Sequence, residues 1–103
     1  MNEIFEISED GKTLIECLDK DIKEAIIPNG ITNIGHDAFK GCSALKNINI
    51  PNSVTTIEKK AFSDCSALLS IDIPNSVTNI GYDAFYNCSA LQSIDIPNSV
   101  TIQ

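Results

Sequence analysis

A phrase of 23 residues recurs along this chain without insertion or deletion. Its copies open at four evenly spaced prolines, and the last copy is shortened to PNSVTIQ: Pro28, Pro51, Pro74 and Pro97. A fixed period of this size is typical of a solenoid, in which each repeat forms one coil and neighbouring coils stack. The period therefore predicts the architecture, whereas the function stays open because one fold can carry many functions.

Length and charge exclude several classes of protein. The 103 residues suffice for one domain, and no apolar run is long enough to cross a bilayer as a helix. The formal net charge is −7, and no lysine or arginine follows Lys60. Because such a surface repels phosphate backbones and anionic lipids, we expect neither nucleic-acid binding nor membrane insertion.

The same apolar positions recur in every full copy and predict a shared interior. In the middle copy these positions are Leu45, Ile48, Ile50, Val54, Ile57, Ala61, Phe62 and Cys65. The Leu-x-x-Ile-x-Ile stretch is β-branched and stops at proline, which predicts the main strand of a parallel sheet. The Val-Thr-x-Ile stretch predicts a second, shorter extended segment. The Ala-Phe-x-x-Cys stretch is too short for a full helix and fits one helical or 3₁₀ turn.

One position interrupts the regular pattern. Gly35 and Gly81 indicate a turn after the second extended segment, but Glu58 occupies the same position in the middle copy. Since glycine alone adopts a left-handed backbone without steric cost, that conformation is not obligatory at this position.

These residues resemble the 23-residue leucine-rich repeat of the BspA-like family. The resemblance rests on the phrase Leu-x-x-Ile-x-Ile-Pro-x-Ser-Val-Thr-x-Ile-Gly-x-x-Ala-Phe-x-x-Cys and covers about residues 22–101. It implies a right-handed leucine-rich repeat, an α/β solenoid that is mostly β. Members of this family are typically displayed on bacterial and some protozoan surfaces, where they bind host proteins or other cells. The resemblance thus implies an adhesin-like protein at the cell surface or secreted.

The chain divides into a head, residues 1–21, and a repeat array, residues 22–103. In the head, Asp10-Gly11 separates two alternating segments, and Asp-Gly is a strong signal for a hairpin turn. We therefore predict an N-terminal β-hairpin that caps the array, because a terminal coil otherwise exposes its interior. The competing interpretation is a helix, because Leu14, Leu18 and Ile22 also fall near one helical face.

Register places the first strand of the array at residues 22–27, with Ile22, Ala25 and Ile27 as its buried residues. At the other end the last copy is incomplete, and Gln103 stands where the full copies have isoleucine. We expect an unpaired strand edge and partly uncovered apolar atoms there, covered by a second copy of the chain or by further coils of a longer array. The N-terminus has no signal-peptide pattern, so we expect an intracellular protein or a piece of an exported one.

The cysteines and the single histidine are interpreted as structural and surface residues. Cys42, Cys65 and Cys88 lie one period apart and form a ladder, whereas zinc requires ligands that converge. We interpret them as small buried side chains without disulfides, while Cys17 lies out of register. His36 aligns with the variable residues Lys59 and Tyr82, which indicates an exposed position.

We expect no catalytic residue, no cofactor and no dedicated metal site. Asp72 and Asp95, with Asn49, form a polar row that could hold a cation only weakly, because like charges in one row repel. Asn87-Cys88-Ser89 matches a glycosylation signal, but its middle residue is predicted to be buried.

The outward positions of the main strands vary between copies and form a broad polar strip. Such a strip suits protein recognition better than an enclosed small-molecule pocket. The chain is therefore predicted to be a non-enzymatic protein-binding module with an unidentified partner. The alternatives are a scaffold that self-associates through its C-terminal edge, and a fragment of a larger surface protein or enzyme. The predicted binding residues are Lys23, Glu24, Ile26, Lys46, Asn47, Asn49, Leu69, Ser70, Asp72, Gln92, Ser93 and Asp95.

Overall fold

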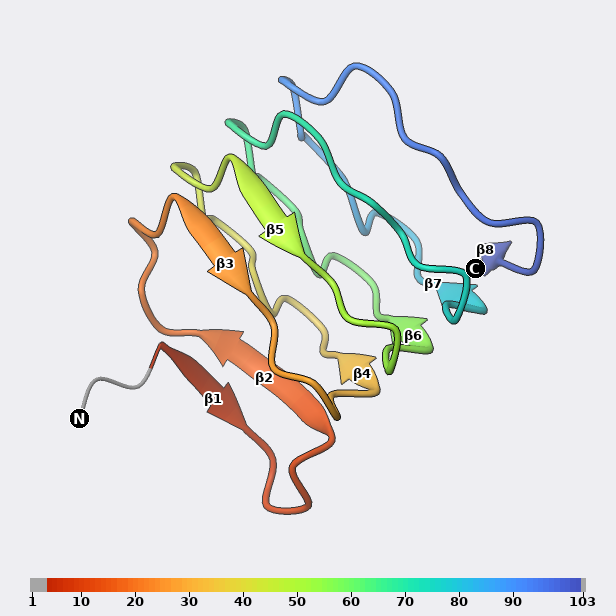
Figure 1. Cartoon of the computed structure of the whole chain (residues 1–103). Helices are drawn as coiled ribbons and strands as arrows, with labels where there is room; N and C mark the ends of the chain where they lie inside the picture. The colour runs from red at the N-terminus through yellow and green to blue at the C-terminus, as the bar shows by residue number, and fades with distance from the viewer. Residues whose placement is uncertain (1–3, 103) are drawn as a thin grey trace.

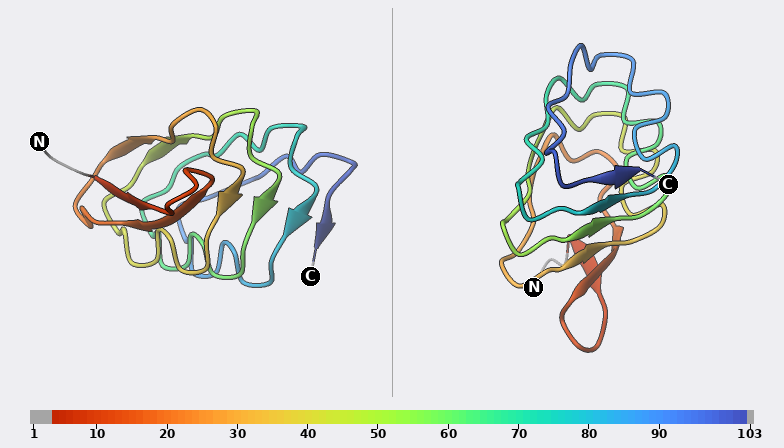
Figure 2. Two further views of the ribbon diagram at one scale, coloured as in Figure 1. Left: turned by 90° about the horizontal axis from the view of Figure 1, so that it is seen from below. Right: turned by 90° about the vertical axis from the view of Figure 1, so that its right-hand side faces the viewer.

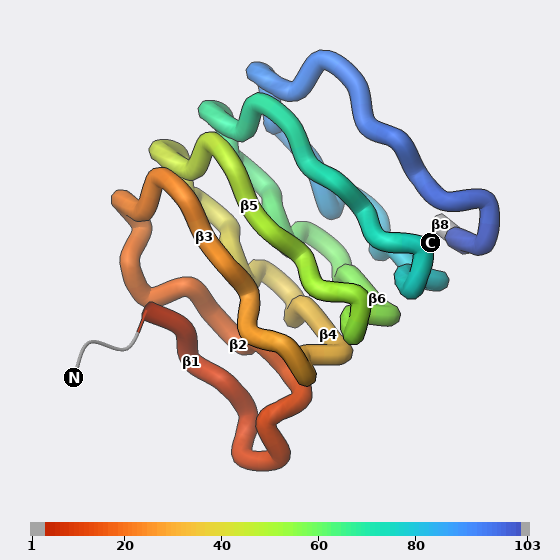
Figure 3. The backbone as a smooth tube through the Cα atoms, in the orientation of Figure 1, coloured from red at the N-terminus to blue at the C-terminus, as the bar shows by residue number. Residues whose placement is uncertain are grey.

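Consecutive repeats form consecutive coils of one stack (Figure 1). The structure is a computed structural model, and it describes residues 4–102, so the expectation for Gln103 lies outside the described residues. The Cα trace shows each coil lying beside the coil one repeat away, with residues 5–17 at one end of the stack (Figure 3). Backbone hydrogen bonds join equivalent positions, such as Thr55 N to Thr32 O and Thr78 N to Thr55 O, each at 2.8 Å. The chain is thus a solenoid of stacked coils.

A six-stranded sheet follows one side of the stack (Figure 2). Its order is β1-β2-β4-β6-β7-β8, with β1 antiparallel to β2 and every other pair parallel. The register pairs Ile34 with Ile57 and Ile57 with Ile80, so equivalent residues of successive repeats lie side by side. The strands are β1 (Phe5–Ile7), β2 (Thr13–Cys17), β4 (Asn33–Ile34), β6 (Thr56–Ile57), β7 (Asn79–Ile80) and β8 (Thr101–Ile102).

The second sheet is smaller than the sequence predicts. It holds β3 (Glu24–Ile26) and β5 (Asn47–Asn49), which pair in parallel. Farther along the same side, a single bridge joins Asp72 to Asp95. The main ladder was predicted on this side, yet the longer ladder lies at the Thr-x-Ile segments.

The predicted helical turn is not confirmed. Among residues 4–102 no helix occurs, hence none long and apolar enough to cross a membrane. In this segment, successive amides donate alternately to a carbonyl of the same coil and to one of the next coil. Ala61 N donates to Glu58 O within the coil at 3.2 Å, and Phe62 N donates to Ala84 O of the next coil at 2.8 Å. Lys60 and Asp64 adopt φ values of 60° and 64° and turn the chain out of any helical path.

The head forms strands and not the alternative helix. The turn between β1 and β2 is held by Asp10, whose carboxylate accepts hydrogen bonds from Ser8 Oγ at 2.7 Å and Lys12 N at 3.0 Å. These hydrogen bonds lower the pKa of the Asp10 carboxyl. Gly11 takes a φ of 75°, a left-handed conformation that glycine adopts without steric cost. The segment is therefore a turn stabilised by its own side chains.

The core is a set of side-chain columns that run along the stack. Every apolar position predicted for the middle copy is buried, from Leu45 to Cys65. In the first strand, Ala25 and Ile27 are buried as predicted, whereas Ile22 is half-buried. Four phenylalanines form the central column, with neighbouring ring centroids 5.9, 5.1 and 5.5 Å apart in the order Phe5, Phe39, Phe62 and Phe85. Ring stacking and burial together make this column the centre of the core.

We predict that Phe62→Ala lowers the free energy of unfolding by about 3–5 kcal/mol, because it opens a cavity between two stacked rings. Urea unfolding followed by circular dichroism measures the change. Tyr86→Ala is the matched control, since Tyr86 is an aromatic residue in the next coil that is 60% exposed. Equal stabilities for the two variants would contradict the assigned role of the column.

Candidate functional site

The outward face of β3, β5 and the equivalent segments of the later coils carries the predicted binding residues. In an extended segment alternate side chains point to opposite sides, so the neighbours of buried Ala25 and Ile48 point outward. All of the predicted residues are exposed: Lys23, Glu24, Ile26, Lys46, Asn47, Asn49, Leu69, Ser70, Asp72, Gln92, Ser93 and Asp95. Hereafter these residues are the β3–β5 face.

The first two coils bring part of this face into close register. Glu24 pairs with Asn47 and Ile26 with Asn49, and they border a shallow groove of about 270 Å³. Two large apolar side chains project from the face, with Ile26 75% and Leu69 56% exposed. Apolar anchors surrounded by polar groups are the composition of a protein-recognition surface.

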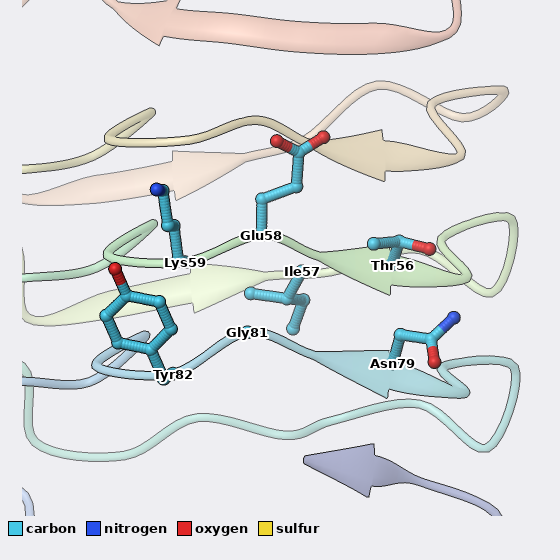
Figure 4. Close-up of a pocket in the computed structure, with 7 residues that line it drawn as sticks. All are labelled: Thr56, Ile57, Glu58, Lys59, Asn79, Gly81 and Tyr82. Carbon is cyan, nitrogen blue, oxygen red and sulfur yellow. The ribbon is translucent and has the colours of Figure 1, made fainter. Parts of the chain in front are cut away.

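A second groove, of about 520 Å³, lies on the six-stranded sheet, and the sequence did not predict it (Figure 4). Its lining comes from β6, β7 and the residues that follow each strand: Thr56, Ile57, Glu58, Lys59, Asn79, Gly81 and Tyr82. We call it the β6–β7 groove. Two signals for it were present in the sequence, namely Glu58 between two glycine positions and the variable column of His36, Lys59 and Tyr82.

Charged and aromatic side chains interact around this groove. Asn33 Nδ2 donates a hydrogen bond to Glu58 Oε2 of the neighbouring coil. The Lys59 ammonium lies 5.7 Å from the centroid of the Tyr82 ring, within reach of a cation–π attraction. His36 is exposed as predicted, and its Nε2 lies 3.4 Å from Asp37 Oδ1.

The cysteines are free thiols, and none of the four is in a disulfide. Cys42 and Cys65 are fully buried as predicted, whereas Cys88 is half-buried because it lies in the last full coil. Cys65 Sγ donates to Phe39 O at 3.2 Å, and Cys88 Sγ donates to Phe62 O at 3.1 Å. Burial raises the pKa of Cys42 and of Cys65 to about 12, and it also raises the pKa of Cys88. These three thiols are therefore protonated at neutral pH and poor nucleophiles.

Within residues 4–102 no group of three or more His, Cys, Asp or Glu side chains is arranged to hold a metal ion. The polar row of Asn49, Asp72 and Asp95 is exposed, and two of its members meet at the bridge.

Most of the sequence matches a known family. The model of the BspA-type leucine-rich repeat region matches residues 17–103. The chain belongs to this family. No curated protein shows significant similarity to it.

Solved leucine-rich repeat structures share the fold of this BspA-type chain. The protein from Bacteroides ovatus is 32% identical to this chain with a TM-score of 0.79, and the match covers 99% of this chain and 30% of the B. ovatus chain. The protein from Bacteroides capillosus is 25% identical with a TM-score of 0.73, and the match covers 90% of this chain and 72% of the B. capillosus chain. The T. pallidum protein is 24% identical with a TM-score of 0.78, and the match covers 96% of this chain and 61% of the T. pallidum chain. This BspA-type chain thus spans less than two thirds of the T. pallidum and B. ovatus structures.

The thiol ladder predicts that alkaline pH destabilises the fold. A cysteine in the unfolded chain has its ordinary pKa of 9.0, whereas folded Cys42 and Cys65 keep their protons until about pH 12. Between these values the unfolded chain binds fewer protons, so the free energy of unfolding falls as pH rises. Urea midpoints at pH values of about 8 and about 10.5 measure this fall.

Cys65→Ala is the comparison for this experiment, because lysine and tyrosine titration is common to both chains. The variant should lose less stability between the two pH values than the unmodified chain does. An identical loss would show that the Cys65 thiol contributes nothing to the pH dependence.

Proposed function

We propose that this chain is a non-enzymatic protein-binding module that recognises its partner through the β3–β5 face. The observation that carries the proposal is the row of exposed, variable side chains on successive coils, with Ile26 and Leu69 projecting from it. A protein partner suits this face because the groove there is shallow and open along the stack.

The described side chains also support a role without catalysis. Cys42, Cys65 and Cys88 have raised thiol pKa values, which opposes nucleophilic attack. The nearest ionic partner of His36 is Asp37, and His36 itself is exposed whereas Asp37 is half-buried. An adhesin-like role on a cell surface is the form of protein binding that the family resemblance suggests.

In this proposal residues 22–103 are the recognition array and residues 1–21 are its N-terminal cap. Phe5 of β1 supports the cap, because its ring packs edge-on against Phe39, the first ring of the stacked column. Without it, the face of Phe39 would meet water.

Site-specific photo-crosslinking tests the proposed surface. A photoreactive amino acid at position 69 should give discrete adducts with partner proteins from a cell-surface and extracellular-matrix extract. Ile26→Asp should reduce these adducts at least ~10-fold, because truncating or charging a central apolar anchor typically costs about 2 kcal/mol or more.

The matched control carries the photoreactive group at position 86, where Tyr86 is similarly exposed but belongs to a different side of the coil. Tyr86→Asp, paired with the group at position 69, controls for added charge. Adducts that form equally at both positions, or that persist after Ile26→Asp, would refute the β3–β5 face as the binding surface.

A second candidate function is self-association through the last coil. The apolar columns lose cover there: Ile96 is 38% exposed, whereas its equivalents Ile50 and Ile73 are 9% and 8% exposed. Phe85 is half-buried, although Phe62 is fully buried. A partly exposed row of this kind favours contact with another apolar surface, such as the same coil of a second copy.

Light scattering across a concentration series tests self-association. The mass should rise with concentration, and Ile96→Lys should return it to that of a monomer by placing a charge in the contact. Ile26→Lys adds the same charge on the β3–β5 face and should leave the assembly intact. A monomeric mass at every concentration would exclude this candidate.

A further inference from the structure

The β6–β7 groove arises where the repeats differ. At equivalent positions of three successive coils stand Gly35, Glu58 and Gly81. The Glu58 side chain extends toward the coil that carries β4, where it accepts the hydrogen bond from Asn33 (Figure 4). Glu58 therefore points away from β7. The groove lies on the opposite side of Glu58, between β6 and β7.

Close backbone packing forms the floor of this groove. A Cβ atom added to Gly81 would lie 2.3 Å from Lys59 N and 2.7 Å from Lys59 Cα, so the two coils touch at this point. Ile57 beneath them is fully buried. The floor is therefore dense and rigid, and the variable side chains stand around it.

The rim combines an aromatic ring with hydrogen-bonding groups of both kinds. Tyr82 is 50% exposed and offers ring surface as well as a hydroxyl group. Asn79 and Thr56 each donate and accept hydrogen bonds, as the Tyr82 hydroxyl does. Such a ring stacks against the C–H face of a sugar, while side-chain amides and hydroxyls bind its hydroxyl groups.

The charged groups near the groove already have partners within the chain. The Glu58 carboxylate accepts from Asn33 on the side of β4, and the Lys59 ammonium lies over the Tyr82 ring. The polar groups that remain for a ligand are neutral, namely the side chains of Thr56 and Asn79 and the Tyr82 hydroxyl. They favour a neutral ligand that carries hydroxyl groups.

From these observations we infer that the β6–β7 groove binds a short neutral carbohydrate. Its volume of about 520 Å³ falls in the range of sites for small organic ligands, and its open form leaves the ends of a longer glycan free. The groove belongs to the six-stranded sheet and is separate from the β3–β5 face. Glycan binding is thus independent of the proposed protein-binding surface.

Titration of the ¹⁵N-labelled full chain with neutral disaccharides tests the inference. Lactose, cellobiose, maltose and diacetylchitobiose are the probes, and sialyllactose, a heparin disaccharide and a lysine-rich peptide are the charged comparisons. At least one neutral disaccharide should cause saturable shifts of the amide signals of Asn79, Gly81 and Tyr82. Affinity should fall at least tenfold in Tyr82→Ala and also fall in Asn79→Ala.

Tyr86→Ala is the matched control, because Tyr86 is an exposed tyrosine four residues away that does not line the groove. Its affinity for the same disaccharide should equal that of the unmodified chain. The inference is overturned if no neutral probe shifts the groove signals, if only a charged probe does so, or if Tyr82→Ala and Tyr86→Ala bind equally.

Discussion

Backbone hydrogen bonds between equivalent positions of successive coils determine the rest of this structure. Thr55 is bonded in this way to the coils on both sides. Its carbonyl accepts from Thr78 N at 2.8 Å and from Thr78 Oγ1 at 3.4 Å, and its amide donates to Thr32 O at 2.8 Å. Because these bonds join positions one period apart, each residue lies beside the equivalent residues of the neighbouring coils. A residue type that recurs at one position of the repeat therefore forms a column along the stack, as the phenylalanines and the cysteines do.

This constraint explains which features could be predicted from the sequence. Buried columns require the same apolar shape in each copy, so repetition in the sequence predicts the burial of residues such as Leu45, Val54 and Phe62. The path of the turn between coils could not be predicted in this way, because it depends on amides that bond to the next coil and on residues with a left-handed backbone. Lys60 takes a φ of 60° at a position where Asp37 and Asp83 stand in the other copies, and lysine gives no signal for that conformation.

The two candidate surfaces also differ in whether the sequence could predict them. Exposure of the β3–β5 face follows from simple alternation in an extended strand, and the sequence located those residues. The β6–β7 groove depends instead on a break in the period, since Glu58 points toward Asn33 of the neighbouring coil and away from β7. Its extent could not be predicted because it requires the direction of one side chain and the spacing of two backbones.

Repeated positions thus stabilise the stack, whereas variable positions shape its surface, and Gly81 contributes to both. Most surface positions can change freely, because their side chains leave the columns and the intercoil hydrogen bonds untouched. A methyl group at Gly81 would instead press on the backbone of Lys59 and separate the two coils. The spacing that the intercoil hydrogen bonds impose is therefore also what shapes the groove floor, so recognition on this sheet is built directly on the packing that stabilises the fold.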